Sequence, residues 1–245
     1  MATDNDRKPN WYQTDVKSIN SDARQLLESY SGLRAEDVVS HVLTLARCAS
    51  SPLISHAIYE RVVEYLLSNP EIGFLDAGCC VEQEIRFLAH EHIASRQLYG
   101  LDMDKAFIDL GYQLFRDKDR LEATSTCGNL TKDDDSKALT QTLGGKIDIV
   151  FASSLLHLWN SETQLKATTR LVAGDYPLTG FNDGTQHRHK LESLKGLWHD
   201  IGQVTHTEWK VDALLEIDDA VRQNMDASWG DLNMRVIWWS ATRIE

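Results

Sequence analysis

The stretch FLDAGCCVEQEIRFL, residues 74–88, constrains the fold more than any other part of the chain. An apolar run ends on Asp76 and turns at Gly78, and apolar residues at helical spacing begin shortly afterwards. Short β-type runs then alternate with helical runs up to residue 152, which predicts a parallel sheet with right-handed crossovers. The predicted strands are Ile72–Asp76, Gln97–Leu101, Glu122–Thr126 and Ile147–Ala152, and the helices between them are Glu82–Ala94, Asp104–Phe115 and Asp134–Leu143.

The two ends of the chain differ from this α/β middle. The first third is helical by its apolar spacing and ends at Pro70, with helices expected at Ser21–Tyr30, Ala35–Cys48 and Ser55–Leu67. Near the C-terminus we expect an antiparallel hairpin at the edge of the sheet, formed by Glu208–Leu215 and Met234–Thr242 after helices at Ser161–Leu171 and Lys190–Gly202. We therefore divide the chain into an N-terminal arm and helical cap, residues 1–70, and an α/β domain, residues 71–245, as one structural unit.

Charge and composition exclude several classes of function. The 25 basic and 37 acidic residues give a net charge of −12 with no basic stripe, so nucleic acid is not expected as a partner. The N-terminus is polar, and no apolar run approaches the ~18 residues of a membrane span, which predicts a cytoplasmic protein. No cysteine spacing is typical of a zinc site, so no metal is expected.

Polar residues follow each predicted strand, where a doubly wound sheet binds its ligand. Asp102 lies 26 residues beyond Asp76, near the offset at which a carboxylate accepts hydrogen bonds from two ribose hydroxyls. Asn129, after the third strand, could bond an adenine edge, although each signal alone is also typical of an ordinary strand and turn. The residues after the strands are Asp76 and Gly78, Asp102, Asn129, and Ser153, Ser154 and His157.

Several blocks of the sequence resemble one family. FLDAGCC resembles the first motif of class I S-adenosylmethionine-dependent methyltransferases. WYQTDVKSINSDARQLLESYSGL, YGLDMDKAFIDLGYQLFRD, KIDIVFASSLLHLW, HRHKLESLKGLW and WGDLNMR resemble a fungal branch that acts on meroterpenoid and related polyketide intermediates. The resemblance implies a Rossmann-like methyltransferase with an N-terminal helical cap and S-adenosylmethionine as cofactor. It also implies methyl transfer to an oxygen of a small terpenoid or polyketide-derived acid or hydroxyl, often a carboxylate of a prenylated aromatic acid.

The resemblance also implies roles for individual residues. Asp76 and Gly78 would line the methionine end of the cofactor, Asp102 would take the ribose, and Asn129 with Leu130 would flank the adenine. Met103 and Ser153 complete the expected cofactor residues. The catalytic residue is unassigned, with His157 as the candidate for a general base or a residue that orients a carboxylate. The expected substrate contacts are Tyr12, His157 and His189, against the alternatives of a mobile arm at Tyr12 and a solvated basic loop at His187–His189.

Three features depart from the family pattern. Asn129 stands where the branch tends to have aspartate, a minor change that keeps an acceptor and adds a donor. Glu82 stands where the turn usually has glycine, and its carboxylate either crowds the methionine moiety or rotates outward to the helix N-terminus. The fifth strand of the sheet is missing or rearranged, because only Leu171–Ala173 could supply it. The alternative function is therefore a methyltransferase-fold protein without methyl transfer, such as a cyclase, a binding protein or a partner subunit. The sequence leaves the choice between monomer and homodimer open.

Overall fold

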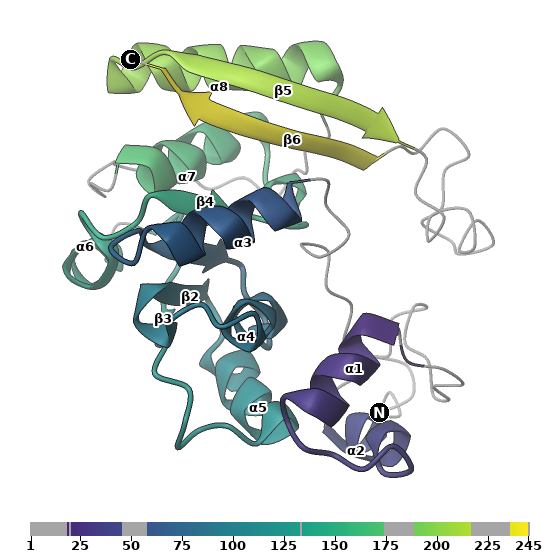
Figure 1. Cartoon of the computed structure of the whole chain (residues 1–245). Coiled ribbons are helices and arrows are strands. Elements are labelled where there is room, and N and C mark those ends of the chain that lie inside the picture. The colour runs from purple at the N-terminus through teal and green to yellow at the C-terminus, as the bar shows by residue number, and fades with distance from the viewer. Residues whose placement is uncertain are drawn as a thin grey trace, which may run out of the picture. The chain divides into compact units, whose positions relative to one another are not determined.

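A computed structural model describes residues 19, 21–45, 58–132, 134–173, 189–216 and 236–244 of the chain (Figure 1). These residues fall into two compact units, of which the described parts are residues 19–173 and residues 189–244. The division at residue 70, which separates the cap from the α/β domain, stays a prediction. Within the described ranges, no helix is both long and apolar enough to cross a membrane.

The larger unit is built on a four-stranded parallel sheet, as the alternating pattern predicts. Its strands are β1 (Phe74–Ala77), β2 (Leu98–Asp102), β3 (Thr124–Cys127) and β4 (Ile149–Phe151), in the order β3-β2-β1-β4. Asp76 of β1 pairs with Gly100 of β2 on one side and with Phe151 of β4 on the other. The strand order reverses between β1 and β4, which is where Rossmann-like sheets bind their ligands.

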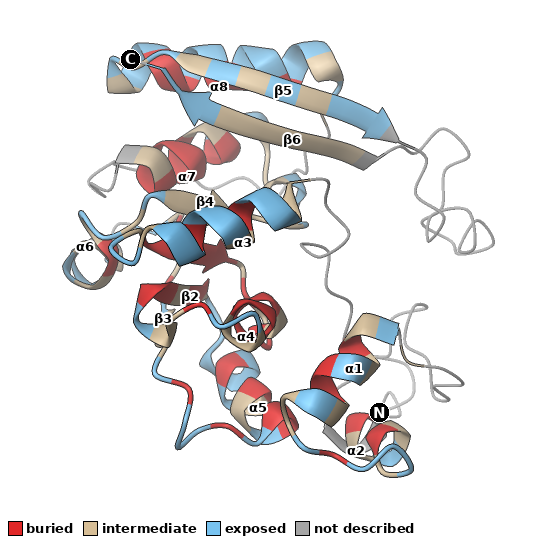
Figure 2. Cartoon of the chain, viewed as in Figure 1, coloured by how far each residue is buried: buried red, intermediate tan, exposed pale blue. Residues whose placement is uncertain are grey.

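Helices cover both faces of this sheet because side chains alternate along each strand. Phe74 faces a core formed with α3 (Tyr59–Ser68) and α4 (Gln83–His90), whereas Leu75 faces α6 (Ser136–Leu143) and α7 (Ser161–Ala173). Figure 2 shows the resulting buried surfaces in red. Asp104 is the N-cap of helix α5 (Lys105–Phe115), and its side chain accepts a hydrogen bond from the Ala106 amide. The short helix η2 (Ser95–Gln97) leads into β2.

The N-terminal helices α1 (Ser21–Ser29) and α2 (Val38–Leu45) pack against α4 and α5. Leu26, Leu27 and Val42 share one apolar cluster with Leu114 and Phe115 of the α5 C-terminus. Val81, in the turn that follows β1, belongs to the same cluster. The N-terminal helices therefore reach the back of that turn.

The C-terminal unit consists of α8 (Leu191–Thr205) and an antiparallel hairpin of β5 (Trp209–Glu216) and β6 (Val236–Arg243). The Trp198 ring of α8 lies with its centroid 4.8 Å from that of Trp209 and 5.3 Å from that of Trp239. The predicted hairpin thus forms, but as a separate two-stranded sheet that does not extend the four-stranded one. Residues 171–173 end helix α7, so in the described part of the chain no strand pairs with the outer edge of β4.

Candidate active site at the carboxyl edge of the sheet

The turn after β1 is tight and folds back onto the end of β2. The backbone amides of Gly78 and Cys79 both donate to the carbonyl oxygen of Leu101, at 2.8 and 3.0 Å. Gly78 has φ +81°, a conformation that glycine adopts without steric cost. Cys80 and Glu82 also have positive φ angles, +48° and +56°, which are strained for residues with a Cβ.

Asp102, at the end of β2, lies beside this turn. Its Oδ2 accepts from the Cys80 amide and its Oδ1 from the Asp104 amide, both at 2.9 Å. Asp102 therefore joins the turn to the start of α5. Because each carboxylate oxygen has two acceptor sites, one site per oxygen remains for a pair of vicinal hydroxyls.

The site is strongly acidic. Asp76 is 4% exposed, and burial raises the pKa of its carboxyl well above the usual range, helped by the negative charges of Glu84, Glu82 and Asp102. A buried carboxyl in such surroundings favours a bound cation, which would let it ionise. The carboxyl groups of Asp76 and Asp102, with the turn at Gly78, thus fit a cofactor that carries a positive charge and a ribose. Met103, next to Asp102, is 69% exposed and available to a ligand.

The loop after β3 holds Asn129 in one orientation. Its Oδ1 accepts from the Thr131 amide at 2.8 Å and from the Thr131 hydroxyl at 2.7 Å. Since a backbone amide can only donate, Oδ1 must face Thr131, and the Nδ2 group faces away. The buried Arg170 of α7 donates from Nη1 to the carbonyls of Leu130 and Lys132, at 2.5 and 3.1 Å, and so fixes this loop from inside.

The loop after β4 lies against the turn after β1. A Cβ on Gly78 would come within 3.1 Å of Leu155 Cδ1, so the two loops meet where the strand order reverses. Ser153 begins the β4 loop and is partly buried, whereas His157 is exposed in the short helix η3 (Leu156–Leu158). The fold thus brings Asp76, Gly78, Asp102 and Ser153 to one edge of the sheet.

The other two predicted substrate residues lie outside the described part of the unit that holds this edge. His189 precedes α8 in the C-terminal unit, where its Nδ1 lies 3.1 Å from the Ser193 hydroxyl. Tyr12 lies outside the described residues. Among the described residues, no group of three His, Cys, Asp or Glu side chains could hold a metal ion.

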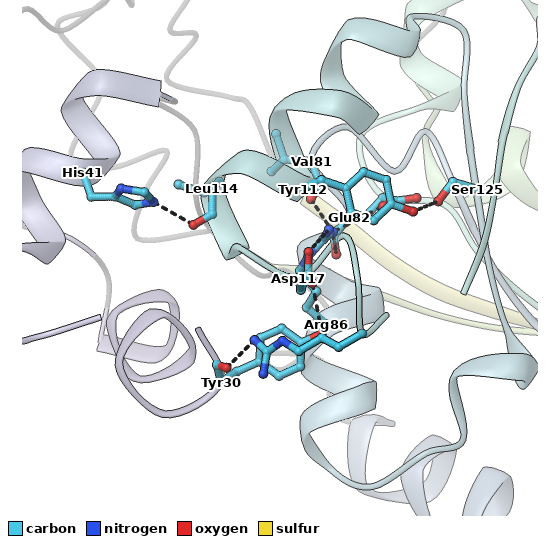
Figure 3. Close-up of polar contacts among 10 residues, drawn as sticks. Tyr30, His41, Val81, Glu82, Arg86, Tyr112, Leu114, Asp117 and Ser125 are labelled. Carbon is cyan, nitrogen blue, oxygen red and sulfur yellow. Dashed lines mark hydrogen bonds and ion pairs between the residues drawn. The ribbon is translucent and has the colours of Figure 1, made fainter. Parts of the chain in front are cut away.

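Glu82 points inward, which is one of the two orientations expected from the sequence. Its side chain is fully buried, and Oε2 lies 3.3 Å from Nη1 of Arg86, on the interior side of the turn (Figure 3). Burial raises the pKa of Glu82, while Arg86 and the Ser125 hydroxyl act in the opposite direction. The outward rotation is therefore wrong, because Arg86 one helical turn later attracts the carboxylate to the interior. That the inward side chain crowds the methionine moiety stays a prediction. The Glu82/Arg86 spacing of four residues was the signal in the sequence for this pair.

Comparisons with known proteins identify similar sequences among methyltransferases. Residues 11–49 match the family model described as "Meroterpenoid methyltransferase N-terminal domain". The chain is 31% identical to O-methyltransferase phiE of Fungal sp. (strain ATCC 74256), over 85% of this chain and 80% of that one. It is 29% identical to O-methyltransferase atr3 of Stereocaulon alpinum, over 84% of this chain and 69% of that one. Among solved structures, the magnesium protoporphyrin IX methyltransferase of Synechocystis PCC 6803, with bound SAH, aligns at 17% identity with a TM-score of 0.45, over 80% of this chain and 88% of that one.

Proposed function

We propose, on the premise that this chain belongs to the fungal O-methyltransferase family, that it methylates an oxygen of a small terpenoid or polyketide-derived acid in secondary metabolism. The observation that carries the proposal is the hydrogen bond from the Cys80 amide to Asp102 Oδ2, at 2.9 Å. It joins the turn after β1 to the acidic residue after β2, beside the reversal of strand order. A nucleoside cofactor with a cationic group fits this arrangement.

The residues of this edge fit S-adenosylmethionine. That cofactor supplies a methyl group on a positively charged sulfur. Asp102 would hold the ribose hydroxyls with the acceptor sites that its backbone contacts leave, and Asp76 with Gly78 would take the methionine end. Asn129 would present Nδ2 to the adenine, because its Oδ1 is engaged by Thr131. The remaining proposed contacts come from Met103, Leu130 and Ser153.

Methylation of a carboxylate requires less catalysis from the protein than methylation of a hydroxyl. A carboxylate is already ionised near neutral pH, so orientation and exclusion of water supply most of what the protein must provide. His157, in the loop that meets Gly78, would orient the acceptor, or accept a proton when the acceptor is a hydroxyl. The proposed substrate contacts are His157, His189 and Tyr12.

The alternative, a methyltransferase fold without methyl transfer, depended on Glu82 and on the short region after the fourth strand. The ion pair with Arg86 supports methyl transfer, because it holds one oxygen of the Glu82 carboxylate inside the protein. We propose further that the protein works in the cytoplasm on small molecules and not on nucleic acid, in keeping with its charge of −12. The homodimer is the alternative to a monomer, and light scattering on the purified chain would distinguish the two.

The activity is tested with an acceptor that carries both oxygen types. The chain is incubated with trideuteromethyl S-adenosylmethionine and a prenylated hydroxybenzoic acid, and the products are analysed by mass spectrometry. The expected product carries one labelled methyl group that alkali releases, because esters hydrolyse and aryl ethers do not. Asp102→Ala is expected to abolish the product. If a panel of such acids gives no labelled product while the cofactor binds, the alternative function is correct.

A further inference from the structure

A buried ionic cluster lies behind the turn after β1. Glu82 and Arg86 are 0% exposed and Asp117 is 1% exposed. Arg86 binds Asp117 through two contacts, Nε to Oδ2 at 2.7 Å and Nη2 to Oδ1 at 3.0 Å, and binds Glu82 through Nη1 (Figure 3). The guanidinium carbon also lies 4.7 Å from the centroid of the Phe115 ring. Two charged contacts and an aromatic face therefore fix the arginine in one orientation.

The same arginine holds the backbone of the turn. Its Nη1 donates to the carbonyl of Val81 at 2.9 Å and to that of Glu82 at 3.1 Å. Cys80 and Glu82 have the strained positive φ angles of this turn, and such conformations persist only where the surroundings enforce them. The cluster supplies that enforcement from the interior side of the turn.

The N-terminal helices are tied to this cluster by side chains as well as by apolar packing. Tyr30, just after α1, donates its hydroxyl to Asp117 Oδ2 at 3.0 Å. Burial and the Asp117 charge both raise the pKa of Tyr30, which keeps this hydroxyl protonated and able to donate. Arg120 stacks on the Tyr30 ring at 4.4 Å from its centroid, and His41 of α2 lies 2.8 Å from the Leu114 carbonyl of α5.

We propose that Tyr30, Asp117, Arg86 and Glu82 are positioning residues that hold the cofactor turn in its binding geometry. Through this path the N-terminal helices set the affinity for the cofactor without touching it. The identity of the ligand rests on the proposed function, whereas the effect on the turn does not. Glu82 stands where the family turn usually has glycine, and its side chain gives the turn an additional interior contact with Arg86.

The test compares Tyr30→Phe with Tyr65→Phe, the same chemical change at a 50% exposed position of α3. Hydrogen exchange of residues 78–86 is measured by mass spectrometry in the ligand-free full chain, and calorimetry gives the dissociation constant for S-adenosylhomocysteine. Tyr30→Phe is expected to exchange faster in this segment and to bind on the order of tenfold more weakly, since one hydrogen bond to a charged group is lost. The KM for S-adenosylmethionine should rise with little change in kcat, and Tyr65→Phe should behave as the unaltered chain.

A third variant separates positioning from general loss of stability. Leu143→Ala removes a buried side chain on the opposite face of the sheet and does not touch the cluster. The inference is overturned if Tyr30→Phe leaves exchange in residues 78–86 unchanged, or if Leu143→Ala accelerates it equally. Absence of binding by the unaltered chain would instead refute the proposed function, and the exchange data would still decide the inference.

Discussion

Gly111→Ala tests how closely α5 must approach the turn after β1. A Cβ at position 111 would lie 2.6 Å from the Val81 carbonyl oxygen and 3.1 Å from its carbon, closer than a methyl group can approach backbone atoms. Alanine in a helix interior normally stabilises by about 1 kcal/mol relative to glycine. Overpacking costs about 1–3 kcal/mol, so the net change is a loss of up to about 2 kcal/mol in the free energy of unfolding.

The matched control is Gly196→Ala in α8, where no atom lies within 4 Å of the added Cβ. This variant should gain about 0.5–1 kcal/mol because only the helix propensity changes. Urea unfolding of both variants is monitored by circular dichroism, with exchange in residues 94–135 and 189–205 used to assign each transition to its unit. Calorimetry should also show weaker cofactor binding for Gly111→Ala, since the turn is displaced. Equal stabilisation by both substitutions would refute the close packing of α5 on the turn.

Three further predictions concern single side chains of the site. Burial raises the pKa of Glu82 above 4.5. The contribution of Glu82 to the free energy of unfolding is therefore present below that value and is lost as pH rises through the pKa in the folded state. Urea unfolding midpoints should show this loss for the unaltered chain and not for Glu82→Gln. Asp76 also has a raised pKa, and a cationic ligand favours its ionised carboxylate, so the affinity for S-adenosylmethionine should increase as pH rises through that pKa. Calorimetry should show that Asp76→Asn removes this increase, and an unchanged pH profile would contradict the assignment. Arg170→Met removes the Nη1 donor that binds the Leu130 and Lys132 carbonyls. It should weaken cofactor binding about threefold to tenfold, with unaltered affinity as the contrary result.

The parallel sheet could be predicted from the sequence because its signals are local. Apolar runs that end on Asp76 and on Asp102 place two strands, and the helical spacing between them requires a crossover. Each strand was predicted to within two residues of its observed bounds. The separate sheet of β5 and β6 could not be predicted, since periodicity identifies a strand and not the strand with which it pairs.

The contacts of Glu82 could not be predicted from the sequence and were found only in the structure. Sequence reasoning considered the cofactor and the helix dipole as the neighbours of this carboxylate and did not consider Arg86. Asp117 lies 31 residues beyond Arg86 and Tyr30 lies far before it, so no local pattern brings the three together. Long-range contacts of this kind decide whether a buried charge is tolerated, and a single sequence does not contain them.

Calorimetric titration of the full chain with S-adenosylmethionine tests most directly whether an inward Glu82 leaves the cofactor site open. With the carboxylate held by Arg86, we predict saturable binding at one site with a micromolar dissociation constant. Glu82→Gly should bind more weakly, because the turn loses an interior contact. Absence of heat from the unaltered chain at millimolar cofactor, or tighter binding by Glu82→Gly, would contradict the central claim.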